Sequence, residues 1–60
     1  MDISKLPLNV QRHIETVNAM DISTDDRVAK LAVLLIDHYD EDEDEAEYFA
    51  KLFNDLGLVK

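Results

Sequence analysis

This 60-residue chain contains no cysteine, and it has only one glycine and one proline. Without cysteine, neither a disulfide nor a thiolate metal site can stabilise the chain. Folds built from β-strands need turn residues along their whole length, whereas Pro7 and Gly57 both lie near the ends. The sequence therefore predicts an all-α protein, with residues 1–60 forming a single helical domain. Oligomerisation remains as a common support for so short a chain.

Long apolar runs are also lacking. The longest one extends from Leu31 to Ile36, whereas a helix that crosses a bilayer needs about 20 apolar residues. The N-terminus has no basic stretch followed by an apolar one, so no signal peptide is predicted. We therefore expect a soluble protein with a cytoplasmic location.

Positive charge is scarce, because six Lys and Arg residues stand against 14 Asp and Glu residues, and the formal net charge is −8 at pH 7. Residues 37–47 contain eight of the acids and no Lys or Arg, so the rest of the chain is neutral overall. These eight residues are termed the acidic block: Asp37, Asp40, Glu41, Asp42, Glu43, Asp44, Glu45 and Glu47.

The acidic block argues against direct binding to nucleic acid or to an anionic membrane, because phosphate groups are bound by Lys and Arg. It favours a positively charged protein as the partner. Carboxylates on a helical scaffold can imitate a row of phosphates, so we predict inhibition or regulation of a nuclease, DNA-binding protein or toxin by nucleic-acid mimicry. Phage-encoded inhibitors and antitoxins of this kind share the composition but no motif. The simpler alternative is that the acids only keep the protein soluble.

Helical periodicity divides the chain into three segments. The first, at about residues 4–19, places four apolar residues on one face, with Ser4 as its N-cap. The second begins at Ser23 or Thr24, and the third extends over about residues 42–56, with Gly57 suited to the position after its end. The predicted fold is a small three-helix bundle. The core faces are Leu6, Val10, Ile14 and Val17 in the first segment, and Ala46, Phe49, Leu52, Phe53 and Leu56 in the third.

The second segment is apolar nearly all round, which predicts a central helix, a dimer interface, or both. Two short neighbouring helices cannot cover all of its apolar residues. We therefore predict that Val33, Leu34 and Ile36 form a homodimer or larger oligomer interface. On this alternative the protein is a structural or assembly module, and the acids serve solubility only.

The boundary between the second and third segments has two interpretations. Their apolar seams are in phase, with Asp42 as the single defect, so one long C-terminal helix that dimerises as a helical hairpin is an alternative. Against it, acids four residues apart repel one another within a helix, whereas acids at a helix start are favourable. We favour a break at residues 40–42.

Motifs for catalysis or cofactor binding are not evident. Asp40, Asp42 and Asp44 have the spacing of the first calcium ligands in an EF-hand, but Glu45 replaces the required glycine and Lys51 the final glutamate. There is no cysteine nucleophile and no Gly-rich phosphate loop. We therefore predict no enzyme activity, no cofactor and no metal site.

Overall fold

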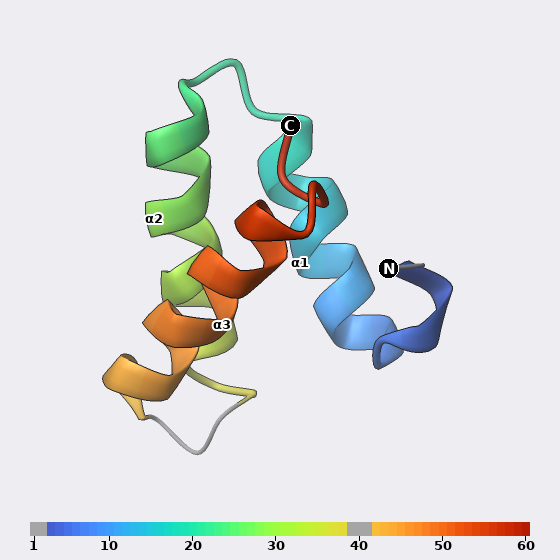
Figure 1. Ribbon diagram of the computed structural model, residues 1–60, viewed down its shortest axis with the longest axis vertical. Coiled ribbons are helices and arrows are strands. Elements are labelled where there is room, and N and C mark those ends of the chain that lie inside the picture. Colours follow the sequence, from blue (N-terminus) through green and yellow to red (C-terminus); the bar gives the residue numbers. More distant parts are fainter. Residues whose placement is uncertain (1–2, 39–41) are drawn as a thin grey trace.

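The computed structural model describes residues 3–38 and 42–60 of the chain. It contains a short 3₁₀ helix, η1 (Ile3–Lys5), followed by α1 (Leu8–Asn18), α2 (Thr24–Leu35) and α3 (Glu43–Asp55) (Figure 1). The described residues include no β-strand. The predicted all-α architecture with three α-helices is therefore confirmed.

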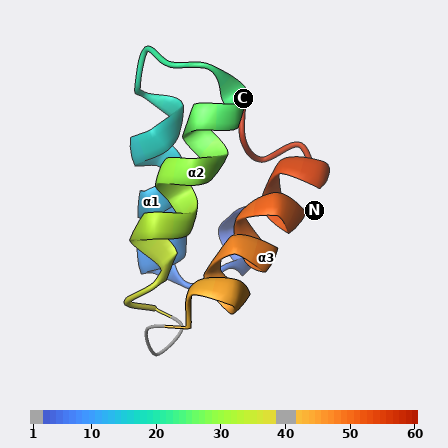
Figure 2. The same ribbon diagram turned by 90° about the vertical axis from the view of Figure 1, so that its left-hand side faces the viewer.

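The second helix is the centre of the fold. Both α1 and α3 pack against α2, whereas no Cα atom of α1 lies within 8 Å of a Cα atom of α3 (Figure 2). Leu31 and Leu35 of α2 face inward and are fully buried. This is the central position that the nearly continuous apolar circumference of the segment predicted.

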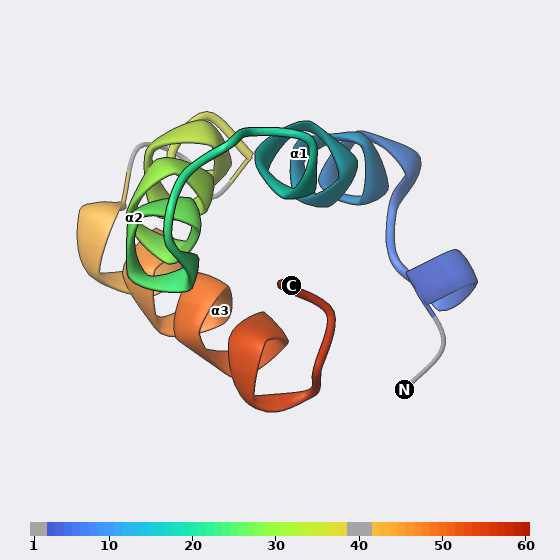
Figure 3. The ribbon, with the colours of Figure 1, turned by 90° about the horizontal axis from the view of Figure 1, so that it is seen from above.

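The C-terminal residues fill the space between α1 and α3. Beyond α3 the chain turns back and runs between these two helices (Figure 3). Val59, in this last segment, is only 6% exposed and joins the core formed by all three α-helices. The buried core residues are Val10, Ile14, Val17, Leu31, Leu35, Ala46, Ala50, Phe53 and Val59.

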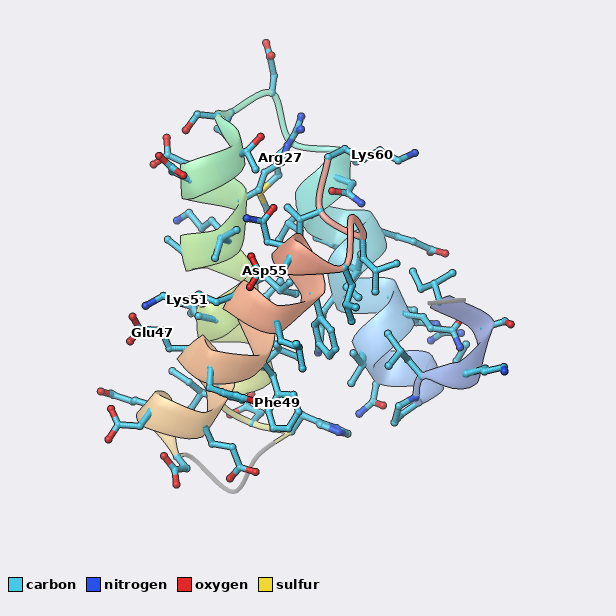
Figure 4. All side chains as sticks on the ribbon, in the orientation of Figure 1. Arg27, Glu47, Phe49, Lys51, Asp55 and Lys60 are labelled. Atoms are coloured by element: carbon cyan, nitrogen blue, oxygen red, sulfur yellow. The ribbon has the colours of Figure 1, made fainter. Side chains whose placement is uncertain are left out.

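Two polar side chains hold the backbone of this last segment. Asn18 Nδ2 donates to the carbonyl oxygen of Leu58, and Asn18 Oδ1 accepts from the backbone N–H of Lys60, both at 2.9 Å. Arg27 Nη1 donates to the carbonyl oxygen of Lys60, and Nη2 donates to that of Met20 at 2.7 Å. Figure 4 shows Arg27 beside Lys60. We term these contacts of Asn18 and Arg27 the tail clamp.

The start of α1 differs from the prediction. Ser4 belongs to η1, and α1 begins only at Leu8, with Pro7 at the N-cap position and no side-chain cap. The physical reason lies in Pro7, because a proline disfavours helical backbone at the residue before it, here Leu6. Gln11 instead secures the entry to the helix, since its Nε2 donates to the carbonyl oxygen of Leu6 at 2.7 Å.

Two other helix boundaries agree with the sequence. Ser23 is the N-cap of α2, and its hydroxyl accepts from the backbone N–H of Asp26 at 3.2 Å. At the end of α3, Gly57 has a φ of 80°, a left-handed conformation that glycine adopts without steric cost. The N–H of Gly57 donates to the carbonyl of Asn54, and that of Leu58 donates to the carbonyl of Phe53. This pair of bonds is a Schellman motif.

The chain breaks between α2 and α3, so the alternative of one long C-terminal helix is wrong. The second helix ends at Leu35, and Asp42 caps the start of α3 at Glu43. Asp42, the one defect in the shared apolar seam, is therefore the residue at which a new helix starts. An aspartate serves better as a cap than in a helix interior, which explains the outcome.

The prediction of the core face of the third segment is partly wrong. Leu56 is 39% exposed, although its spacing placed it with the core, and Ala50 is fully buried in its stead. Leu56 is the C-cap of α3 and its backbone is still helical, so its exposure reflects its place at the end of the helix rather than a change of register. Ala50 belongs to the core that all three α-helices share, where its small side chain allows close packing. Tyr39, which follows Leu35 at helical spacing and would extend the apolar face of the second segment, lies outside the described residues.

Candidate binding surface

The described members of the acidic block lie at one end of the molecule, around the connection between α2 and α3 (Figure 1). The chain reaches this end when α2 stops at Leu35, and it leaves along α3. Asp40 and Glu41 lie outside the described residues. The six described members are all exposed: Asp37, Asp42, Glu43, Asp44, Glu45 and Glu47.

One acid of the block has a direct role in the fold. Asp42 Oδ1 accepts a hydrogen bond from the backbone N–H of Glu45 at 3.1 Å, which caps α3. Glu43, Asp44 and Glu45 follow in the first turn, where the helix dipole favours negative charge. The fold therefore tolerates this density of acids at the one place on α3 where a helix gains from them.

Glu47 differs from the other acids because it has a basic partner. Its Oε1 lies 2.9 Å from Lys51 Nζ, one turn further along α3, and both side chains are exposed. The hydrogen bond from Lys51, and then the charge of Lys51, lower the pKa of Glu47. Among the described residues, no basic nitrogen lies within 4.0 Å of a carboxylate oxygen of Glu43, Asp44 or Glu45. Within the part of the chain that the structure describes, the helix start and solvent compensate these three charges.

The three residues predicted as an oligomer interface have different surroundings. Val33 is 63% exposed on α2. Leu34 and Ile36 are half-buried and already pack against the core of their own chain. The apolar area available to a second chain is therefore smaller than the sequence suggested, and Val33 is its most exposed member.

A groove of about 620 Å³ lies between the exposed sides of α2 and α3. Its lining includes Val33 and Ile36 from the predicted oligomer interface, and Glu43 and Glu47 from the acidic block. In Figure 4, Glu47 and Lys51 project from α3 on the side of α2. The sequence presented the apolar and the acidic surface as alternatives, whereas the structure brings part of each into the lining of one groove. Nothing in the linear pattern indicated this, because it depends on how the two helices pair.

The outer side of α3 carries a second feature that the sequence analysis missed. Tyr48 is 57% exposed, directly after the acidic block. Its ring meets that of Phe49 edge to face, with 5.3 Å between the ring centroids, and Phe49 in turn lies 6.1 Å from Phe53. A row of aromatic rings thus leads from the core to the surface. Phe49 is also labelled in Figure 4, at the lower end of α3.

His38, in the turn that follows α2, lies close to α1. Its Nδ1 is 3.1 Å from Nδ2 of Asn9.

Within residues 3–38 and 42–60, no three His, Asp or Glu side chains are grouped so that they could hold a metal ion. None of the helices described has both the length and the apolar character to cross a membrane. Comparisons with protein-family models, with curated proteins and with solved structures found no match to this chain.

Proposed function

We propose that this chain is a small acidic binding protein of the cytoplasm that contacts a positively charged protein through the acidic block. The partner is a protein that handles nucleic acid, such as a nuclease, a DNA-binding protein or a toxin. By occupying the basic surface of that partner, the acids inhibit or regulate it. The protein carries out no chemistry of its own.

The observation that supports this proposal most is the exposure of Glu43, Asp44 and Glu45 without a basic side chain nearby among the described residues. The rest of the chain has as many basic as acidic residues, so the net charge of −8 arises from residues 37–47 of the sequence. Such a concentrated field attracts an oppositely charged surface and speeds its association. A protein that needed acids only for solubility would gain as much from spreading them over its surface.

The second support is the rigidity of the positions from which the acids project. The cap by Asp42 holds the start of α3 in place, and Glu47 pairs with Lys51 one turn further along. A basic surface that binds a phosphate backbone is itself an ordered array of Lys and Arg. Carboxylates at fixed helical positions meet such an array with less loss of conformational entropy than a disordered acidic tail would.

Competition with nucleic acid tests the proposal. The chain is used to capture its partner from its native host, and binding of the purified partner is then measured at increasing salt and in the presence of duplex DNA. We expect the affinity to fall steeply with salt and DNA to compete for the same surface. A partner that binds DNA and this chain simultaneously, with little salt dependence, would rule out nucleic-acid mimicry.

The alternative function, a module that self-assembles through α2, is favoured by one observation only, the 63% exposure of Val33. Sedimentation of the purified protein distinguishes the two. A monomer at all practical concentrations is expected for the acidic binding protein. An assembly that Val33→Gln dissociates would instead support the structural role.

A further inference from the structure

The groove between α2 and α3 has a regular construction that follows from helix geometry. On both the α2 side and the α3 side, the lining residues recur at spacings of three and four. One face of each helix therefore borders the groove. The helices are antiparallel neighbours, so the groove runs along α2, whose 12 residues correspond to a length of about 18 Å. The α2 side is formed by Asp25, Val28, Ala29, Ala32, Val33 and Ile36, and the α3 side by Glu43, Glu47, Lys51 and Asn54.

The floor of the groove is apolar and incompletely covered. Val28, Ala32 and Ile36 are half-buried, whereas Ala29 and Val33 are exposed. Alanines at two of these positions leave room between the larger side chains, which is what an inserted side chain from another molecule requires. An apolar strip bordered by polar residues is the typical form of a protein interaction site.

The rim of the groove is acidic. Glu43 lies at one end and Asp25 at the other, and the charge of Glu47 between them is matched by Lys51. Glu43 and Asp25 are therefore left without a basic partner among the described residues. An occupant needs an apolar strip for the floor and positive charges that flank it.

From these observations we propose that the groove is the docking site for a basic amphipathic helix of the partner protein. The apolar side chains of that helix lie on Val33 and its neighbours, and its Lys and Arg side chains contact Glu43 and Asp25. The length of the groove accommodates about three helical turns. This inference rests on the proposed function, because it specifies which part of a positively charged partner the chain binds.

Charge also argues against a second copy of this chain as the occupant. A two-fold dimer through the groove places the same surface on both sides of the interface. The rim acids Asp25 and Glu43 of the two copies would then lie close together, in a molecule of net charge −8. Like charges that face one another across an interface weaken it.

Two synthetic peptides test the proposal. The first is a helical peptide of about 14 residues with Leu at positions i, i+3, i+4 and i+7 and Lys at flanking positions. The second has the same composition in an order without an apolar face. We expect the amphipathic peptide to bind the full chain at least about tenfold more tightly, measured by calorimetry at low salt. Amide chemical shifts should change at Ala29, Ala32 and Val33.

Matched variants locate the binding site. Val33 and Leu8 are both 63% exposed, but only Val33 borders the groove. Val33→Gln should weaken binding of the amphipathic peptide about tenfold, because an apolar contact of this size is lost, and Leu8→Gln should leave it unchanged. Glu43→Gln, at the rim, should weaken binding about threefold, and Glu45→Gln, in the same helical turn but outside the groove, should weaken it less.

The outcomes distinguish docking in the groove from binding by charge alone. If both peptides bind equally and Val33→Gln has no effect, the groove is not the docking site, although the acidic block still binds a basic partner. If neither peptide binds at low salt, the proposed function fails as well. If the chain forms a dimer that Val33→Gln dissociates, the occupant is a second copy and the proposal is overturned. Circular dichroism of each variant confirms that it remains folded.

Discussion

The two ends of this bundle use polar side chains in opposite ways. At the end where α1 meets α2, Asn18 and Arg27 are half-buried, and their hydrogen bonds go to backbone groups of the last residues and of Met20. At the end where α2 meets α3, Glu43 and Asp44 are exposed and have no basic partner among the described residues. At the α1–α2 end, polar side chains hold the last residues of the chain in place, whereas at the α2–α3 end they expose charge to solvent.

This difference shows that the contacts that close the fold and the exposed acids lie at separate ends of the chain's helical bundle. A 60-residue domain buries only about 60% of the surface that its unfolded chain exposes. The tail clamp compensates by fixing Val59 against the core, in the space that α1 and α3 leave between them. At the acidic end, the main contribution to the fold is the cap by Asp42.

The largest effect on stability is expected at the tail clamp. Asn18→Ala removes two hydrogen bonds to the backbone of Leu58 and Lys60, and it should lower the free energy of unfolding by about 2 kcal/mol. Asn18→Asp keeps the acceptor for Lys60 but sets a carboxylate oxygen against the carbonyl oxygen of Leu58, so it should cost at least as much. Urea denaturation measures both. An Asn18→Ala protein as stable as the wild type would show that the clamp does not hold the tail.

The second largest effect concerns the guanidinium of Arg27. Its Nε and Nη2 both donate to the carbonyl oxygen of Met20, while Nη1 reaches Lys60. A lysine cannot reproduce this planar arrangement, so Arg27→Lys should lower the free energy of unfolding by about 1.5 kcal/mol. Arg12→Lys, at an exposed position of α1, is the control and should change it little. Equal effects of the two would contradict a specific role for Arg27.

Asp42 tests the difference between the two ends from the other side, because this member of the acidic block stabilises the fold as the N-cap of α3. Asp42→Ala should lower the free energy of unfolding by about 1 kcal/mol, and Asp42→Ser should retain most of it, since serine also caps helices. Asp44→Asn lies two residues further along and removes no cap. Thermal unfolding of the three variants tests this, and a loss at Asp44 as large as at Asp42 would mean that charge rather than capping stabilises the start of α3.

The smallest effect is expected at the exposed pair of Glu47 and Lys51. Because Lys51 lowers the pKa of Glu47 in the folded chain, the pair stabilises the fold above the ordinary pKa of a glutamate. This contribution is lost as the pH falls through the lowered pKa. Lys51→Met should return the pKa of Glu47 to its ordinary range, as followed by NMR titration. An unchanged pKa in that variant would show that the ion pair does not form in solution.

The sequence was sufficient for the helices and for most of their ends. The 3.6-residue period located Val10, Ile14 and Val17 in the core, and Ser23 and Gly57 marked a start and an end because their roles depend on neighbouring residues alone. The start of α1 was predicted too early, since the effect of Pro7 on the preceding residue outweighed the capping potential of Ser4.

The tail clamp and the groove could not be predicted in this way. Asn18 and Lys60 are 42 positions apart, so their contact depends on how α3 returns the chain to α1. In the sequence, Asn18 only signals that α1 ends. The groove likewise requires the pairing of α2 with α3, which places Val33 and Glu43 on one surface. Periodicity describes each helix separately and contains no information about such neighbours.

The central claim is that the acids at the start of α3 serve binding rather than the fold, and one variant tests it most directly. The variant combines Glu43→Gln, Asp44→Asn and Glu45→Gln and keeps the cap at Asp42. We predict that its free energy of unfolding changes by less than about 1 kcal/mol, because lost dipole interactions and relieved repulsion offset each other. Its affinity for the basic amphipathic peptide at low salt should fall more than about tenfold. Undiminished binding, or a chain that no longer folds, would contradict the claim.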